Sequence, residues 1–287
     1  MSSSASSTLS LALDAPIVLA HGLLGFGRIG LGRLTLAEYF RDIPRYLESL
    51  GNRVLVTNVP AVAGIATRAE ALREQILEAF PGEPVHIVGH SMGGLDARAL
   101  LARGDSSIRI ASLTTIATPH LGSPLADLVK MHAGRLSAWL TRMGLDHRGI
   151  LDVTRPAARA FHHRCAAPSG VACFSAAGAP ERSQVCKVLR RFHELLEGLE
   201  GPNDGLVSAA SATAFGTPLP AWPLDHFRQM NWLTPTGPDE LDPTIAGCYR
   251  SVLANLAEHG FARRDRPPGF GRLPARLSSG PFEPMRI

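Results

Sequence analysis

The chain has 287 residues, of which 45% are hydrophobic and 19% are charged, and these values indicate an ordinary globular protein of one α/β domain with a cap, or at most two domains. No apolar run approaches the length that crosses a bilayer, which argues against a transmembrane segment. The formal net charge of +4 arises from the last 27 residues. Their basic side chains form no stripe along a predicted helix or strand, which argues against nucleic-acid binding.

The chain begins with a short polar segment, Met1 to Ser7, and few apolar residues precede Asp14. A secretory signal has a basic start and a longer apolar core, so residues 1–13 are predicted to be an N-terminal extension and not a signal peptide. The missing signal favours the cytoplasm, and export of a trimmed chain is the alternative.

Five apolar runs separated by helical patterns predict the strands of a central sheet. Continuous apolar runs are typical of parallel strands that are buried on both faces. Residues 14–260 are therefore predicted to form an α/β domain with a mostly parallel sheet and helices on both sides. The runs are Ile17–Ala20, Val54–Val59, Val85–Val88, Leu113–Ala117 and Val171–Ala176.

Three of the predicted helices have recognisable ends. The first covers residues 37–50 and stops before a glycine, and the second begins with a capping box formed by Thr67 and Glu70. The last helix opens with an aspartate followed by a proline and covers residues 242–260.

The most informative motif is Gly89-His90-Ser91-Met92-Gly93, which has the form G-x-S-x-G and follows the third predicted strand. Glycines on both sides allow a strand to turn sharply into a helix and hold the serine oxygen clear of the main chain. The pattern predicts Ser91 as a nucleophile, with His90 as the variable residue that points away from the chemistry. The pentapeptide alone also occurs by chance, so the prediction depends on finding partners for the serine.

An attack by Ser91 needs N–H groups that stabilise the developing oxyanion. The helix after Ser91 directs its first N–H groups toward that place, and Met92 is the predicted donor. The second donor is expected from the glycine-containing loop at residues 21–26, after the first strand, where we predict the N–H of Leu23.

The insertion at about residues 123–160 is longer than a crossover between two strands requires. Within it Leu136, Trp139, Leu140 and Met143 fall at helical spacing. This helix is predicted either to pack permanently on the body or to act as a movable lid over Ser91. A second cap helix, at about residues 184–200 with its core from Val185 to Leu199, is predicted to form the other wall of the cap.

A serine is a weak nucleophile until a base removes its proton, and that base needs a carboxylate behind it. In chain order the acid should precede the histidine. Asp204 stands in a turn directly before an apolar run and is the predicted acid, with Asp225 as the alternative. His226 follows a short segment bounded by proline and is the predicted base.

The chain contains four cysteines whose spacing fits no zinc site: Cys165, Cys173, Cys186 and Cys248. A bridge between the first two across a short loop is conceivable, and the sequence leaves the state of all four thiols open. Residues 261–287 form a basic tail rich in proline and glycine, with six arginines against Asp265 and Glu283. A surface strap or a disordered end is the preferred interpretation of this tail.

Four segments in this order resemble the bacterial triacylglycerol lipases of the Pseudomonas and Burkholderia type: residues 21–26, 89–94, 117–123 and 203–207. The resemblance covers about residues 14–258 and implies an α/β-hydrolase fold that lacks the first two strands. It assigns Ser91, Asp204 and His226 to a catalytic triad and Leu23 and Met92 to the oxyanion hole. Those lipases hold a calcium ion through an aspartate two residues after the histidine and carry a disulfide around the acid. This chain has Arg228 at that position and no cysteine between 186 and 248, so neither the ion nor the bridge is expected, and no cofactor is predicted.

The predicted function is therefore a serine ester hydrolase that cleaves triacylglycerols or other fatty acyl esters, acting at an oil–water interface if the lid moves. The enzymatic alternative is a carboxylesterase for short soluble esters, with a thioesterase or polyester hydrolase further off. The alternative from another class is a non-catalytic member of the fold that binds an apolar ligand or a partner protein. That alternative predicts a lost triad residue, and none is lost here. The sequence leaves chain-length preference and oligomeric state open.

Overall fold

The computed structural model describes residues 10–23, 28–31, 34–132, 148–234 and 241–263. A six-stranded sheet lies at its centre, in the order β4-β1-β5-β6-β7-β8, and every neighbouring pair in this sheet is parallel. The strands are β1 (Ile17–Ala20), β4 (Val54–Val56), β5 (Pro84–His90), β6 (Arg109–Ile116), β7 (Ala172–Ala176) and β8 (Thr217–Pro218). This architecture confirms the predicted fold class.

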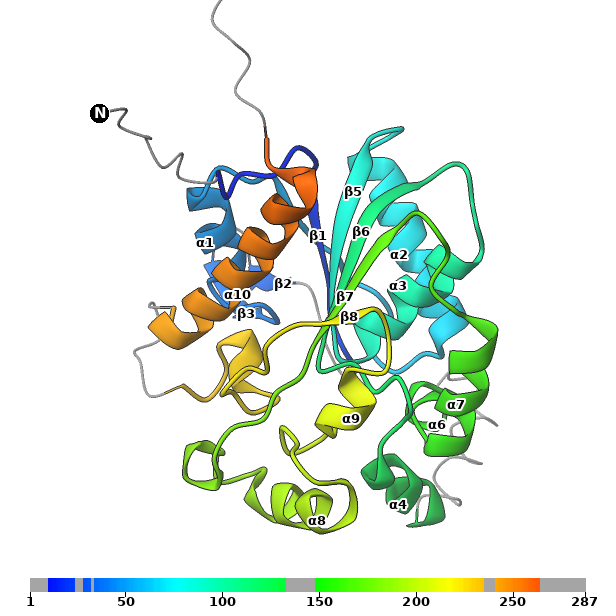
Figure 1. The fold of residues 1–287 in the computed structure, drawn as a ribbon, viewed down its shortest axis with the longest axis vertical. Helices are drawn as coiled ribbons and strands as arrows, with labels where there is room; N and C mark the ends of the chain where they lie inside the picture. The colour runs from blue at the N-terminus through cyan, green and yellow to red at the C-terminus, as the bar shows by residue number, and fades with distance from the viewer. Residues whose placement is uncertain (1–9, 24–27, 32–33, 133–147, 235–240, 264–287) are drawn as a thin grey trace, which may run out of the picture.

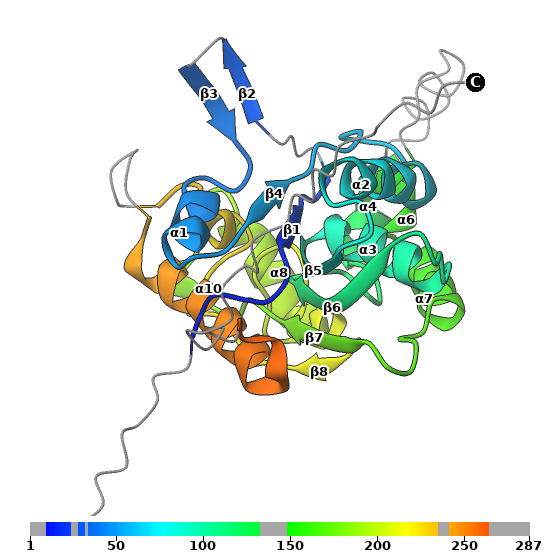
Figure 2. The same cartoon turned by 90° about the horizontal axis from the view of Figure 1, so that it is seen from above.

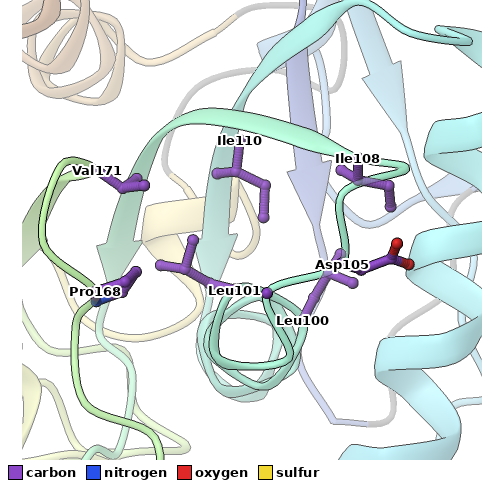
Figure 3. Close-up of a pocket in the computed structure, with 8 residues that line it drawn as sticks. Leu100, Leu101, Asp105, Ile108, Ile110, Pro168 and Val171 are labelled. Atoms are coloured by element: carbon purple, nitrogen blue, oxygen red, sulfur yellow. The ribbon is translucent and has the colours of Figure 1, made fainter.

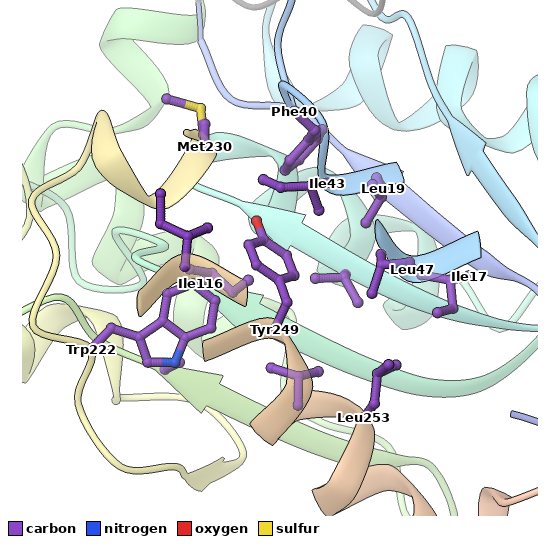
Figure 4. Packing of buried hydrophobic residues seen from close by; sticks show 14 of the residues in the cluster. Ile17, Leu19, Phe40, Ile43, Leu47, Ile116, Trp222, Met230, Tyr249 and Leu253 are labelled. Carbon is purple, nitrogen blue, oxygen red and sulfur yellow. The ribbon is translucent and has the colours of Figure 1, made fainter. Parts of the chain in front are cut away.

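Successive residues of a strand point to opposite faces of a sheet, so a continuous apolar run supplies two cores at once. In β1, Ile17 and Leu19 join the cluster on one face, while Val18 and Ala20 join the cluster on the other. Tyr249 packs in the first of these clusters (Figure 4). The parallel strands are therefore held from both sides by burial of apolar surface.

Helices cover both faces of the sheet (Figure 1). Two of them, α1 (Ile43–Ser49) and α10 (Pro243–Leu256), lie on one face, and α2 (Ile65–Ala79) and α3 (Met92–Ala102) lie on the other. The remaining helices gather at one end of the sheet: α4 (Pro124–His132), α6 (Gly149–Asp152), α7 (Arg155–Arg164), α8 (Arg190–Glu200) and α9 (Ala209–Ala212). Among the described helices, none combines the length and apolarity that a membrane span requires.

Three short turns and a hairpin complete the described elements. The turns are the 3₁₀ segments Arg182–Gln184 and Arg228–Met230 and the π segment Ala257–Phe261, which continues α10. The antiparallel hairpin of β2 (Arg28–Leu31) and β3 (Leu34–Glu38) stands away from the body (Figure 2).

Several predicted helix boundaries are wrong. Residues 34–38 form β3, and α1 begins only at Ile43, after Asp42 in a left-handed conformation (φ 61°). The second helix begins at Ile65 and not at the Thr67–Glu70 box, because the carboxylate of Asp152 accepts from the N–H of Ile65 at 2.8 Å.

The second cap helix also begins later than its apolar pattern suggests. It starts at Arg190 and not at Val185, because Val185 and Leu189 are buried by packing outside a helix. The start of the last helix is confirmed, since the side chain of Asp242 accepts from the N–H of Thr244 at 2.8 Å. The hairpin and β8 were not predicted, and the predicted lid helix at residues 136–143 lies outside the described residues.

The order of the strands creates a crevice at the carboxyl ends of β1 and β5. From β1 the chain continues to β4 on one side, whereas from β5 it continues to β6 on the other. Loops that diverge in this way leave room between them, and ligands of open α/β sheets bind at such points. Leu23 follows β1 and Ser91 follows β5, so the topology brings two predicted site residues to this crevice.

Candidate active site

Ser91 occupies a strained turn between β5 and α3, with φ 54° and ψ −128°. Such a conformation is unfavourable for a residue with a side chain and persists only where the surroundings hold it. The flanking glycines make the close packing possible. A Cβ on Gly89 would lie 2.7 Å from Gly94, and a Cβ on Gly93 would lie 2.2 Å from the carbonyl oxygen of Ala20. The glycines of the motif are therefore required by the fold of this turn.

Asp204 and His226 are joined by a hydrogen bond of 2.7 Å between Oδ2 and Nδ1. The other carboxylate oxygen, Oδ1, accepts from the N–H groups of Leu206 and Val207 at 2.9 and 2.8 Å. Asp204 is fully buried and His226 is nearly so. With an acceptor facing Nδ1, the ring carries its proton there and leaves Nε2 free to act as a base.

The alternative acid, Asp225, is committed to other contacts. Its Oδ1 accepts from the N–H groups of Phe227 and Arg228, both at 3.0 Å, and its Oδ2 accepts from the N–H of Cys186 at 2.8 Å. These bonds cap the short turn after His226. Of the two candidate acids, the structure brings Asp204 to the histidine.

Ser91 and His226 line the same cavity, which has a volume of about 410 Å³. Both predicted oxyanion donors, Leu23 and Met92, line it too. Met92 is the first residue of α3, and the first N–H groups of a helix have no intrahelical acceptor. The other lining residues are mostly apolar: Tyr39, Pro119, Ser123, Leu125, Ala126, Val153, Leu206, Val207, Phe227, Met230 and Trp232.

The main chain before Leu23 is held by two buried side chains. Arg68 donates through Nη2 to the carbonyl oxygens of His21 (2.7 Å) and Gly22 (3.3 Å), while its Nε pairs with Asp96 at 2.9 Å. The ring of His21 contacts the Gly22 oxygen through Nδ1 at 2.9 Å. Its Nε2 accepts from the N–H of Val59 at 3.1 Å, so Nδ1 is the protonated nitrogen and donates.

His90 does not point away from the chemistry as predicted. Its ring centroid lies 4.6 Å from that of His226, and the side chain is fully buried. Its hydrogen bonds lead to Tyr39 on one side and to Gln229 on the other. Arg68, Tyr39 and Gln229 carried no local motif that could have identified them.

Four buried histidines have lowered pKa values because burial disfavours their charged form. The pKa of His21 falls to about 4, that of His86 is lowered, and those of His90 and His120 lie well below the usual value. A positive Arg98, 2.9 Å from the ring of His120, adds to this effect. Burial acts in the opposite direction on the carboxyl of Asp96 and raises its pKa to about 7.

These shifts predict that the free energy of unfolding falls as the pH drops below about 6.5. Between the native and unfolded pKa values the unfolded state binds more protons, so each such histidine removes up to ~1.4 kcal/mol per pH unit on acidification. The carboxyl of Asp96 changes the free energy of unfolding with pH in the opposite direction, and it offsets the contribution of one of the four histidines. Urea unfolding at pH 8, 7, 6 and 5 measures the sum, and His120→Gln, whose side chain does not titrate, should flatten the curve. Equal stability at pH 7 and pH 5 would contradict this expectation.

Arg228 stands where the resemblance would place a calcium-ligating aspartate, and the absence of that ion stays a prediction. Arg228 holds a guanidinium 3.7 Å from the carboxylate of Asp242 and donates to the carbonyl of Gln184 at 3.2 Å. A positive group in contact with these oxygens opposes cation binding. Across the described part of the chain, no group of three or more His, Cys, Asp or Glu could hold a metal ion. All four cysteines are free thiols, so the conceivable bridge between Cys165 and Cys173 does not form.

A second cavity, of about 310 Å³, lies between the end of α3 and the start of β6 (Figure 3). It is lined by Leu100, Leu101, Gly104, Asp105, Ile108, Ile110, Pro168 and Val171. Its one carboxylate, Asp105, is paired with Arg73. This cavity offers no nucleophile beside a base, whereas the cavity at Ser91 offers both.

Comparison with known proteins gives matches along most of the chain. Residues 15–162 match the family model of the alpha/beta hydrolase fold. The chain is 28% identical to triacylglycerol lipase 2 of Saccharomyces cerevisiae, over 78% of this chain and 74% of that protein. It is 38% identical to a triacylglycerol lipase of Vibrio cholerae, over 40% of this chain and 36% of that protein. It thus spans about a third of the length of this bacterial relative.

Solved structures share the fold. A metagenomic carboxyl esterase superposes with a TM-score of 0.68 at 22% identity, covering 88% of this chain and 77% of that one. The lipase of Staphylococcus hyicus superposes with a TM-score of 0.62 at 18% identity, covering 85% and 95%. The sequence matches confirm the resemblance to bacterial lipases and support a carboxylic ester hydrolase.

Proposed function

The chain belongs to the α/β-hydrolase family, and on that premise we propose that it is a serine ester hydrolase of the lipase type. His226 removes the proton of Ser91 as the serine oxygen attacks an ester carbonyl, and Asp204 stabilises the imidazolium that forms. The observation that carries this proposal is the Asp204–His226 bond of 2.7 Å at the wall of the cavity that also contains Ser91.

The tetrahedral oxyanion is held by the N–H groups of Leu23 and Met92 in this proposal. The alcohol leaves with the proton from His226, and an acyl group remains on Ser91. A water molecule, deprotonated by His226, then attacks the acyl carbonyl through a second oxyanion, which releases the acid and restores the serine. Apart from this water molecule, the groups that act in each step are side chains and main-chain groups of the protein, and no step calls for a metal or cofactor.

The surroundings of the cavity favour acyl chains as substrates. Its lining is mostly apolar, which suits the hydrocarbon part of an ester. Large apolar side chains are exposed on α4 and α8, which lie at the same end of the sheet (Figure 1): Leu128, Val129, Met131, Phe192, Leu195 and Leu199. We propose that these exposed apolar side chains face apolar partners, here a lipid phase. The names of the yeast and bacterial relatives agree with triacylglycerols as the substrate class.

A series of nitrophenyl esters from acetate to palmitate tests the substrate class. Each methylene buried in the cavity contributes ~0.8 kcal/mol, so kcat/KM should rise about fourfold per carbon until the cavity is filled. A decline from acetate onward would instead identify a carboxylesterase for short esters. A protein that turns over no ester and resists labelling by a fluorophosphonate would be a non-catalytic binding protein.

A further inference from the structure

Behind the catalytic residues runs a continuous chain of buried hydrogen bonds. The hydroxyl of Tyr39 lies 2.9 Å from Nδ1 of His90, and Nε2 of His90 lies 3.0 Å from Oε1 of Gln229. The amide nitrogen of Gln229 then donates to Oδ2 of Asp204 at 3.2 Å, the same oxygen that accepts from His226. All these residues are at most 4% exposed.

The direction of each bond follows from the acceptors at the far end. The nitrogen of Gln229 faces the carboxylate of Asp204 and the carbonyl of Leu224 (3.2 Å), and both of these groups only accept. The oxygen of Gln229 therefore faces His90, whose Nε2 must donate. Nδ1 of His90 is then unprotonated and accepts from the hydroxyl of Tyr39. Burial lowers the pKa of His90 well below its usual value, in agreement with a neutral ring here.

The Tyr39 end of this hydrogen-bond chain lies beside the loop that carries the predicted oxyanion donor. A Cβ on Gly22 would lie 2.6 Å from the hydroxyl of Tyr39 and 2.7 Å from the Cβ of Ser91. The Tyr39 hydroxyl therefore packs directly against Gly22, which places this loop beside the hydrogen-bond chain. At the opposite end, a Cβ on Gly178 would lie 2.2 Å from the amide nitrogen of Gln229, so a glycine there leaves room for that amide.

We propose that Tyr39, His90 and Gln229 are positioning residues that fix Asp204, and through it His226, relative to the oxyanion loop. The proposal rests on the proposed function and extends it to residues that do not touch the reacting atoms. The main-chain N–H groups of Leu206 and Val207 hold one oxygen of Asp204, and the amide of Gln229 holds the other. A carboxylate fastened at both oxygens cannot rotate away from His226. The ring of His90, packed 4.6 Å from that of His226, limits the rotation of the base.

The test compares Gln229→Met and Tyr39→Phe, alone and together, with wild type on a soluble nitrophenyl ester. Gln229→Met should lower kcat about 10- to 100-fold with KM within twofold, because small displacements of catalytic groups cost this much. Asp204 is the charged group in contact with the ring of His226, and the neighbouring ring of His90 is neutral. Without the amide donor, more of the Asp204 charge stabilises the imidazolium, so the acid limb of the kcat/KM profile should move to higher pH.

Tyr39→Phe removes the hydroxyl that donates to Nδ1 of His90 and should lower kcat about threefold to tenfold. The kcat of the double variant should be within twofold of that of Gln229→Met alone, since both substitutions interrupt the same chain of hydrogen bonds. Tyr249→Phe is the matched control, because Tyr249 is equally buried and its hydroxyl donates to the main-chain oxygen of Gln229 at 3.2 Å, outside this chain. The kcat of Tyr249→Phe should stay within twofold of the wild-type value. Thermal unfolding of each variant shows whether it is folded, and Tyr39→Phe keeps the test decisive if the Gln229→Met variant does not fold.

A second readout does not depend on turnover. The low-field NMR signal of the His226 Nδ1 proton, recorded in a Ser91→Ala background, should shift when Gln229→Met is added. An unchanged signal, wild-type kcat and an unmoved pH profile in folded variants would overturn the positioning role, as would strictly additive losses in the double variant. Absence of ester turnover in the wild type, together with a shifted signal, would instead remove the proposed function and leave the contact to Asp204 in place.

Discussion

Replacing Ser91 with alanine should lower kcat on esters by about 10⁵-fold or more while leaving the fold intact. Without the serine oxygen no acyl-enzyme can form, and loss of a nucleophile of this type costs about 10⁶ in kcat in a comparable triad enzyme. The strained main chain of the turn is unaffected, because alanine has the same Cβ and the N–H of residue 91 still donates to Ile116 at 2.8 Å. The melting temperature should therefore stay within a few degrees of wild type.

Ser123 provides the matched control for this experiment. It lines the same cavity, but its hydroxyl donates to the carbonyl of Leu206 at 2.7 Å, which gives it a structural role. Ser123→Ala should retain labelling by a fluorophosphonate and most of its turnover, whereas Ser91→Ala should lose both. Residual esterase activity above a few per cent in a purified Ser91→Ala protein would refute the assignment of the nucleophile.

Much of the sheet, together with the site residues that local patterns mark, could be predicted from the sequence. The strand before Ser91 is mostly apolar, with His86 as a buried polar residue, because both its faces are buried. The glycines of the motif are required by close contacts with Gly94 and Ala20. Asp204 and His226 follow β7 and β8 in the order that the fold imposes. Short-range signals suffice for such residues because each sits in a turn with its own sequence pattern.

The residues that support this site gave no comparable signal. Gln229 lies 139 positions from His90, and Tyr39 lies 51 positions from it, so only the tertiary fold brings them together. The same holds for helix starts. Asp152, 87 positions along the chain, accepts from the first N–H of α2, and no local box could reveal that contact. The two-residue strand β8 is too short to show any alternation of apolar and polar side chains.

Arg68→Lys should lower kcat about 100- to 1,000-fold with little change in KM, because Arg68 orients a predicted oxyanion donor. The carbonyl of Gly22 and the N–H of Leu23 belong to one planar peptide and point in opposite directions. Arg68 and the ring of His21 hold that carbonyl from one side, so the N–H is directed to the other side and polarised by the positive charge. Loss of one oxyanion donor costs 10²- to 10³-fold in a related site.

Lysine keeps the positive charge beside Asp96 but cannot reproduce the bonds that the guanidinium makes to Asp96, His21, Gly22 and Pro60. Affinity for a boronate that forms a tetrahedral adduct should fall in parallel with kcat, since the adduct uses the same donors. Arg73→Lys on the same helix is the control, because Arg73 pairs with Asp105 and Glu70 and touches no part of the oxyanion loop. Full kcat in a folded Arg68→Lys protein would show that the peptide before Leu23 holds its orientation without the guanidinium, and would contradict the role assigned to Arg68.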